Sequence, residues 1–451
     1  MTRATASESQ AISRAVRKTE VFAGQSLLQR PPTYSVAQPR CRLTGSDVDN
    51  AKVSFELDDN LFSRHLLFIG GIGTGKTNAI SQIISQIKPH MTSNDVMFIF
   101  DTKGDFYEQF YKPGDVVISN DDKAIGTNGP DYWNIYQELT KGRTLETDVI
   151  EVARTLFYEK TQRTNQPFFP NAARDLFTAI LLNFRRSTDC SKQNNAYLRK
   201  FIDSSTPAAL REMLQEHEDL RAIASYISED RSPQTQGVFS ELQQTLREIF
   251  VENFARAGTL SVRDVIRQKG GKTIFVEYDL GIGNALTPIY RLLFDLAIKE
   301  SVRRNRSEGN VWFVIDEFRL VPNLQHIDDG VNYGRSLGAK FIIGVQNVEY
   351  LYHIYGEQLA RSILSGFMTC VSFSVNDEAT RKFVQGRYGK NRKMESFSSS
   401  VSNKPVHEQL REGNVVEDWD IANLPTGRAI VGIPNREPFL FQFDPYRPKQ
   451  P

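Results

Sequence analysis

The segment at residues 70–77, GGIGTGKT, constrains this chain more than any other part of its sequence. It matches G-x-x-x-x-G-K-[ST], and it stands between an apolar run at residues 65–69 and a helical pattern at residues 78–86. A phosphate-binding loop requires this context, because glycines let backbone N–H groups turn toward phosphate oxygens and the helix start adds its positive dipole end. A Rossmann motif does not fit, since the glycines follow G-x-G-x-G and precede Lys-Thr.

The residues of this loop have distinct expected roles. Lys76 would bring a positive charge to the β- and γ-phosphates, and Thr77 would place its hydroxyl on Mg²⁺. The residues predicted to bind the nucleotide are Gly70, Gly71, Gly73, Thr74, Gly75, Lys76 and Thr77. The 6 histidines show no metal-ligand spacing, so the sequence predicts ATP and Mg²⁺ as cofactors and no other metal.

Residues 311–317, VWFVIDE, form an apolar strand pattern that ends in two acidic residues. Alone, such a strand end is common, but together with the phosphate-binding loop it indicates that Asp316 holds Mg²⁺ and Glu317 orients the attacking water. The next strand pattern ends in Gln346, which would lie beside these carboxylates and sense the γ-phosphate. The alternative for Gln346 is a hydrogen bond within a turn.

Two further charged residues are candidates for the same site. Arg335, in the segment YGRSLG near the expected end of a helix, is either a solvated surface charge or an arginine finger that reaches a neighbouring subunit's nucleotide. Asp101 directly follows the apolar run at residues 96–100. It would act on Mg²⁺ or water, or else cap a turn.

Short apolar runs of β type predict the fold class. Runs without alternation are typical of parallel strands covered on both faces, and helical patterns follow several of them, so we expect an α/β fold with a mainly parallel sheet. Between about residues 144 and 256 helical patterns dominate and predict an all-α insertion, whereas residues 1–45 are polar and predict a flexible arm. The predicted strands are residues 65–69, 96–100, 116–118, 273–278, 311–315, 340–345 and 369–373.

Composition excludes several classes of protein. The 55 Lys and Arg residues balance 54 Asp and Glu residues, so no overall positive field favours a nucleic acid or a membrane. The 3 cysteines form no CxxC pair, which argues against a disulfide framework or a structural zinc site. No apolar stretch reaches the roughly 18 to 20 residues that span a bilayer, and no signal peptide is evident, so we expect a cytoplasmic protein.

The order of these motifs resembles the type IV secretion coupling-protein family, the hexameric DNA-pumping ATPases of conjugation, which are similar to the HerA and FtsK motors. The resemblance covers about residues 55–445. It rests on the loop itself and on the following segments: RHLL before it, DTKGDFYEQFY, YWN, FFPNAA, VIDEF, the strand ending in Gln346, and LPTGRA near the end.

The resemblance implies a RecA-like P-loop core with an inserted all-α domain, and a homo-hexameric ring around sequence-independent DNA. The implied domains are residues 46–186 and 251–451 for the core and 187–250 for the insertion. Arg335 matches the finger in trans, and Arg64 and Arg381 match further basic positions near the nucleotide. The family's usual N-terminal transmembrane helices are missing from the sequence, so we expect a separate membrane or effector protein partner.

Two functions remain open at this point. One is an ATP-driven DNA translocase that serves mobile-element transfer or a related process. The other is a nucleotide-controlled assembly ATPase, for example in anti-phage defence, that does not move along DNA. Basic runs at residues 303–306 and 387–393 would suit phosphates, although such runs are more often solvated.

Overall fold

The predicted strands lie in two units of a computed structural model that describes residues 16–120, 131–162, 164–303, 309–398 and 407–448. Unit 1 comprises residues 1–87 and 343–451, and unit 2 comprises residues 88–342. The boundary falls within strand β9 (Ala339–Val345), which begins in unit 2 and ends in unit 1. We describe each unit by itself.

Unit 1 contains a mixed sheet with the strand order β3-β2-β14-β13-β10-β4. β10 pairs with β4 in parallel, with Val371 opposite Phe68, and the other pairs are antiparallel. These strands are β2 (Pro39–Ser46), β3 (Lys52–Asp58), β4 (Leu66–Ile69), β10 (Thr369–Ser372), β13 (Arg428–Gly432) and β14 (Phe439–Phe443). The helices are α2 (Asp59–Phe62), α3 (Lys76–Ile87), α13 (Val348–Tyr355), α14 (Glu357–Ser365), α15 (Glu378–Tyr388) and α16 (Asp418–Ala422).

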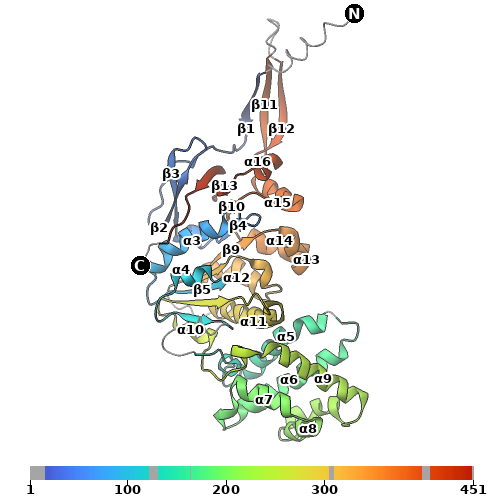
Figure 1. Cartoon of the computed structure of the whole chain (residues 1–451). Helices are drawn as coiled ribbons and strands as arrows, with labels where there is room; N and C mark the ends of the chain where they lie inside the picture. The colour runs from blue at the N-terminus through green and yellow to red at the C-terminus, as the bar shows by residue number, and fades with distance from the viewer. Residues whose placement is uncertain (1–15, 121–130, 163, 304–308, 399–406, 449–451) are drawn as a thin grey trace, which may run out of the picture. The chain divides into compact units, whose positions relative to one another are not determined.

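A second, antiparallel sheet of unit 1 joins β1 (Val16–Ala23), β11 (Lys390–Ser398) and β12 (His407–Asn414), as Figure 1 shows. The sequence predicted an arm at residues 1–45, but the structure places β1 and β2 within that range. The Ser-rich segment at residues 396–403, whose composition predicts an exposed loop, also differs: β11 extends through residues 396–398, and residues 399–403 lie outside the described residues. Both differences have one cause: polar strands lack the apolar runs by which buried strands are predicted.

Unit 2 contains parallel strands in the order β8-β5-β7-β6. Every residue of β5 and of β8 is buried, which explains why their sequences are continuous apolar runs. Phe98 of β5 packs edge-on against Phe294 of α11 at a centroid distance of 4.7 Å. The strands are β5 (Val96–Asp101), β6 (Val116–Ile118), β7 (Lys272–Glu277) and β8 (Val311–Ile315), and the helices beside them are α4 (Asp105–Phe110), α10 (Val262–Gln268), α11 (Gly283–Ser301) and α12 (Ile327–Tyr333). The predicted α/β class and parallel strands are confirmed.

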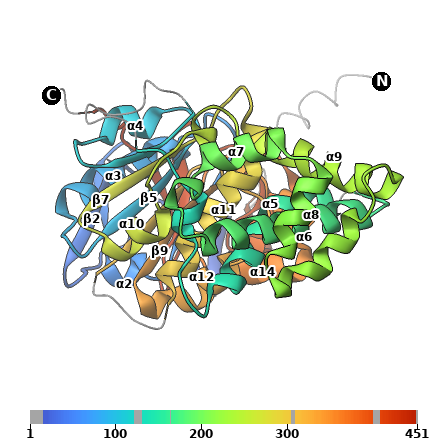
Figure 2. The same ribbon diagram turned by 90° about the horizontal axis from the view of Figure 1, so that it is seen from below.

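The helical region predicted between about residues 144 and 256 is present in unit 2. α5 packs against both α6 and α11, and α6 packs against α9 (Figure 2). Phe157 of α5 and Phe177 of α6 meet at a centroid distance of 5.7 Å. The helices are α5 (Leu145–Gln162), α6 (Phe168–Arg186), α7 (Asn195–Ser204), α8 (Pro207–Gln215) and α9 (Pro233–Ile249). The boundaries 187 and 250 for an insertion domain stay a prediction.

Candidate functional site

The loop at residues 70–77 follows β4 and leads into α3, the arrangement predicted from its sequence. Lys76 is the first residue of α3, and its Nζ donates to the carbonyl oxygens of Gly70 at 2.7 Å and Gly71 at 3.0 Å. Thr74 Oγ1 also donates to Gly71 O at 2.8 Å. The loop is therefore closed by its own side chains, and the ammonium group of Lys76 is held at its backbone.

Two glycines of the loop have no space for a side chain. A Cβ on Gly70 would lie 2.7 Å from Phe373 Cβ. Gly75 has a φ of +117°, and a Cβ there would lie 3.1 Å from Gly427 Cα. Gly73 differs, because its φ is +72° but an added Cβ would meet nothing within 4 Å. Steric crowding thus explains why position 70 is glycine, and a positive φ explains position 73. Both reasons apply to Gly75.

Segments distant in sequence hold the loop through backbone hydrogen bonds within unit 1. Gly70 N–H donates to Val345 O at 3.1 Å, which brings the start of the loop beside the end of β9. Gly71 N–H donates to Ser374 O at 2.9 Å, and Gly427 N–H donates to Thr74 O at 2.9 Å. Gln346 directly follows Val345, so unit 1 brings the predicted sensor residue and the phosphate-binding loop together.

The amide that makes the turn hydrogen bonds is that of Asn347, the next residue along the chain. Its Oδ1 accepts from Glu349 N–H at 2.6 Å and from Tyr350 N–H at 3.2 Å, which caps α13. The choice between a γ-phosphate sensor and a turn hydrogen bond for Gln346 stays a prediction. Gln346 is half-buried beside the loop.

The two additional basic positions have different surroundings. Arg64 precedes β4, whose four residues span about 13 Å, and the loop follows β4, so the two lie at opposite ends of the strand and a role for Arg64 near the nucleotide stays a prediction. Arg381 is on α15, and its Nε donates to Asp418 Oδ1 at 2.6 Å while Nη1 donates to Asn376 O. This guanidinium already has an ion pair in unit 1.

Unit 2 presents acidic residues at the carboxyl ends of adjacent parallel strands. Asp101 ends β5 and lies in register with Glu277, which ends β7. Asp316 and Glu317 follow β8, which pairs with β5 in parallel. Parallel strands bring their ends to one edge, so these carboxyl groups lie at the same edge of the unit 2 sheet. Glu277 was not predicted, although it ends an apolar run as the other acids do.

Asp101 makes local backbone hydrogen bonds. Its Oδ2 accepts from Tyr107 N–H at 2.7 Å and its Oδ1 accepts from Lys103 N–H at 3.3 Å, so it caps the turn that leads into α4. Burial raises the pKa of this carboxyl above its usual value, against the lowering effect of these hydrogen bonds. Of the two roles considered, capping is the one that the geometry supports.

Glu317 has an arginine partner that the sequence did not reveal. Arg319 Nε lies 3.3 Å from Glu317 Oε1; the Arg319 side chain is 54% exposed and that of Glu317 is 13% exposed. Arg335 lies in a short 3-10 helix (Gly334–Leu337) after α12, as predicted, and is exposed. The sequence around Glu317 does not show that Arg319 pairs with it, because the pairing depends on how the chain turns after β8.

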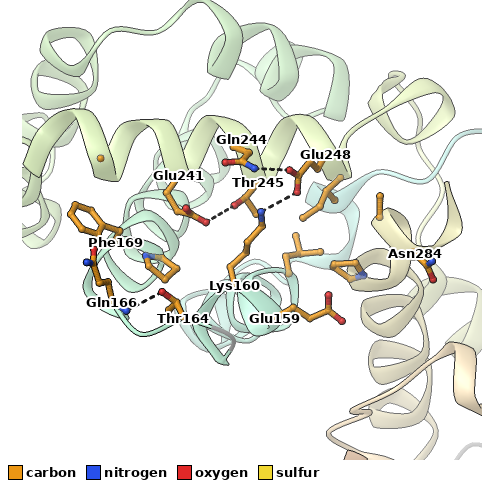
Figure 3. Close-up of a pocket in the computed structure, with 16 residues that line it drawn as sticks. Glu159, Lys160, Thr164, Gln166, Phe169, Glu241, Gln244, Thr245, Glu248 and Asn284 are labelled. Carbon is orange, nitrogen blue, oxygen red and sulfur yellow. Dashed lines mark hydrogen bonds and ion pairs between the residues drawn. The ribbon is translucent and has the colours of Figure 1, made fainter. Parts of the chain in front are cut away.

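A cavity of about 730 Å³ lies elsewhere in unit 2, between α5, α6, α9 and the start of α11 (Figure 3). Lys160 Nζ lies 3.1 Å from Glu248 Oε2, and Gln244 Nε2 donates to Glu248 Oε1 at 2.9 Å. Glu159, at another wall of the cavity, pairs with the buried Arg291 at 3.0 Å. Three carboxylates and one ammonium group of the described residues line it, those of Glu159, Glu241, Glu248 and Lys160.

No helix in the described part of the chain is long and apolar enough to cross a membrane. No cluster of three or more His, Cys, Asp or Glu side chains there is arranged to hold a metal ion. A magnesium ion at such a site would therefore depend on one or two side chains together with phosphate oxygens, which is how Mg²⁺ usually binds beside nucleotides.

Comparison with solved structures shows which fold this is. The bacterial conjugative coupling protein TrwBdeltaN70 superposes with a TM-score of 0.70 at 20% identity, over 88% of each chain. TrwB in complex with the ATP analogue ADPNP gives a TM-score of 0.71 at 18% identity, over 96% of each chain. VirB4 of Thermoanaerobacter pseudethanolicus gives 0.55 at 13% identity, over 91% of this chain and 98% of that one. The fold is that of TrwB, a RecA-like core with a helical domain.

Sequence comparison gives the family. The type IV secretion system-coupling protein VirD4 of Bartonella henselae is 22% identical over 273 residues, 57% of this chain and 42% of that protein. VirD4 of Bartonella quintana is similar, and the match covers 40% of its length, so the chain spans about two fifths of these relatives. The model of the family described as type IV secretion-system coupling protein DNA-binding domain matches residues 48–440. The chain belongs to this family of coupling proteins.

Proposed function

We propose that this chain is a Mg²⁺-dependent ATPase that moves DNA without reading its sequence. The observation that carries the proposal is the loop at residues 70–77, where Gly70 and Gly75 are crowded by neighbouring atoms, Gly73 and Gly75 have positive φ, and Lys76 lies against the loop backbone. Membership of the coupling-protein family supports DNA as the partner. TrwB, which shares the fold, was solved with ADPNP and with ADP and Mg²⁺, which supports these cofactors.

Each predicted residue has a role in this proposal. Lys76 exchanges the carbonyls of Gly70 and Gly71 for phosphate oxygens, and Thr77 and Asp316 hold the Mg²⁺ that neutralises phosphate charge. Glu317 orients and activates the attacking water. Gln346, beside the loop, contacts the γ-phosphate and loses that contact after hydrolysis.

We further propose that the active form is a ring of six copies of this chain, as the resemblance to the coupling-protein family implies. Arg335 is exposed and follows α12, so in a ring it is available to a neighbour's nucleotide, where its charge would stabilise the transition state. In such a ring Arg64 would also act near a nucleotide, and Arg381 would do so after exchanging its ion pair with Asp418 for phosphate.

The near-neutral composition favours a second candidate, an assembly ATPase that binds partners and does not travel on DNA. The net charge of +1 gives the whole molecule no attraction for phosphates, whereas DNA-binding proteins commonly have a basic surface. Both candidates use the same catalytic residues, so only the response to DNA separates them.

One experiment tests both. ATP turnover is measured with Mg²⁺ alone and with single-stranded or duplex DNA, while the particle mass is recorded in each nucleotide state. The motor predicts turnover that rises with DNA and a ring-sized particle. Turnover that ignores DNA at low salt in an assembled ring favours the assembly ATPase, and no turnover under any condition contradicts both.

A further inference from the structure

A groove of about 530 Å³ crosses the surface of unit 1 between α13, α14 and α15. Its apolar part includes Tyr352 of α13, Leu364 of α14 and Phe383 of α15. The charged side chains that line it are Arg361, Lys382 and Arg387, and among the described residues no acidic side chain lines it. The groove is therefore apolar along its floor and cationic around it.

These cations have partners that an anion would readily replace. Arg361 pairs with Glu357 at 2.7 Å and Lys382 with Glu378 at 2.5 Å, each one turn apart on its own helix. Both pairs are exposed to solvent, where water and salt screen them, so they hold their cations weakly. Arg387 Nη2 donates to the backbone oxygen of Phe367, a bond that leaves its charge without a carboxylate among the described residues.

Aromatic rings also line the groove beside these charges. The guanidinium of Arg361 lies over the ring of Tyr352, 5.5 Å from its centroid, and the ring of Phe383 is half-buried in the same groove. Aromatic rings and guanidinium planes are the surfaces on which unstacked bases stack, while cations follow the phosphates. A base in a duplex offers only its edge, so a groove of this kind suits a strand whose bases are free to turn.

We propose that this groove binds a short segment of single-stranded nucleic acid, with bases on Tyr352 and Phe383 and phosphates at Arg361, Lys382 and Arg387. The proposal rests on the proposed DNA motor. It adds that the bound segment is single-stranded and that it lies in this groove. An acidic peptide would satisfy the cations as well, but it would leave the stacking surfaces without a matching group. The combination of rings and cations therefore favours a nucleic acid.

Gly386 offers a way to block the groove without removing a charge or a ring. It lines the groove, and a Cβ added there would meet nothing within 4 Å. It also lies within α15, where a larger residue has a better helix propensity than glycine. Gly386→Leu should therefore fold and fill the space that the strand would occupy.

The test compares binding of a labelled oligothymidylate and of a duplex by the full chain. Tyr352→Ala and Gly386→Leu should each weaken single-strand binding about 5- to 100-fold, the range expected for the loss of a stacked base. The double variant Arg361→Gln, Lys382→Gln should lower the slope of log affinity against log salt by about 1.4, which corresponds to two phosphate contacts. Arg42→Gln with Lys52→Gln, two exposed paired cations of unit 1 outside the groove, is the matched control and should change neither.

The outcomes separate this proposal from the one on which it rests. A chain that hydrolyses ATP and binds oligothymidylate equally well with Tyr352→Ala and Gly386→Leu overturns the groove and leaves the motor standing. An equal loss of duplex and single-strand binding also overturns it. If polyglutamate competes as well as oligothymidylate and Tyr352→Ala has no effect, the groove takes an acidic protein instead. A wild-type chain that binds no DNA at low salt contradicts the motor itself.

Discussion

The two units differ in how they build their polar sites. In unit 1 the phosphate-binding loop is made from backbone: Gly70 and Gly75 leave little space for a side chain, and Val345, Ser374 and Gly427 hold the loop through main-chain hydrogen bonds. In unit 2 the acidic edge is made from single side chains at strand ends, and each has its own partners, such as Arg319 for Glu317. A backbone site needs a contiguous sequence, whereas a side-chain site needs only the right residue at each strand end.

This difference predicts how each site fails. A substitution in the loop of unit 1 acts through shape and should change nucleotide binding. A substitution at the acidic edge of unit 2 acts through charge and should change the chemical step, with the nucleotide still bound. The predictions that follow either sharpen this contrast or contradict it.

The largest effect is expected for Arg335→Ala, which should lower turnover about 10³-fold or more if the residue acts as an arginine finger. Mixing two variants tests whether Arg335 acts on the nucleotide of a neighbouring subunit. Subunits with Arg335→Ala keep their own loop and carboxylates, and subunits with Lys76→Ala keep the finger, so a mixture should recover part of the turnover that neither variant has alone. No recovery after proven subunit exchange, or a fully active monomer at high dilution, would leave Arg335 a surface charge.

Glu317→Gln should lower turnover about 10²-fold or more, because a neutral amide cannot accept the proton of the attacking water. ATP affinity should stay near the wild-type value, since the loop of unit 1 is unchanged. Lys76→Ala is the matched opposite, because it should weaken ATP binding itself. Equilibrium binding and single-turnover hydrolysis separate the two variants. Full turnover by Glu317→Gln would exclude this carboxylate from catalysis.

Sequence alone predicted the buried parallel strands well and the antiparallel strands poorly. Every apolar run named as a strand is one, with β6 and β8 at their predicted bounds, because both faces of these strands are covered. β1, β11 and β12 were missed, since a solvated antiparallel sheet needs no apolar run. The antiparallel strands β2, β3, β13 and β14 were not named either, although β13 is almost fully buried. The loop at residues 70–77 was predicted because its geometry demands consecutive residues.

The site residues whose roles depend on how the chain turns after a strand were not predictable in the same way. No motif links Arg319 to Glu317, and the placement of Arg64 before β4 follows only from where the strand begins and ends. Asp101 could be read as a catalytic or a capping residue, and its hydrogen bond from Tyr107 N–H decided the matter. Side-chain sites of this kind need the fold before their members can be assigned.

Gly75→Ala should weaken ATP binding about 30-fold or more. The positive φ alone costs a non-glycine residue about 1 to 2 kcal/mol, and the new Cβ would also press on Gly427 Cα at 3.1 Å. Gly73→Ala is the matched control, because its φ is also positive but its Cβ would meet nothing. Its effect should be several-fold smaller in the same titration. Equal effects would mean that space around Gly75 does not matter.

The smallest effect concerns the stability of unit 2 and its dependence on pH. Burial raises the pKa of Asp295 on α11 to about 7, whereas an unfolded Asp titrates near 4. Between these two pKa values the folded chain holds a proton that the unfolded chain has lost. The contribution of Asp295 therefore lowers the free energy of unfolding as pH rises to about 7. Above that pH its contribution no longer changes. The groups around Asp295 are His326, whose backbone N–H donates to it at 3.2 Å, Arg291 on the same helix, and the pair Glu151 and Lys299 that flanks the His326 ring.

Asp295→Asn removes this titration and keeps an oxygen for the His326 N–H, so the stability of the variant relative to wild type should increase by about 2 to 3 kcal/mol from pH 5 to pH 8. The Glu151 hydrogen bond raises the pKa of His326 in both proteins, whereas the Asp295 charge, which raises it further, is absent from the variant. Asp219→Asn is the matched control: Arg186 lowers the pKa of Asp219, so its small contribution is lost toward acid, the opposite direction. Urea unfolding across this pH range measures all three proteins, and a wild-type curve parallel to that of Asp295→Asn would mean that Asp295 is already ionised in the folded chain at pH 5.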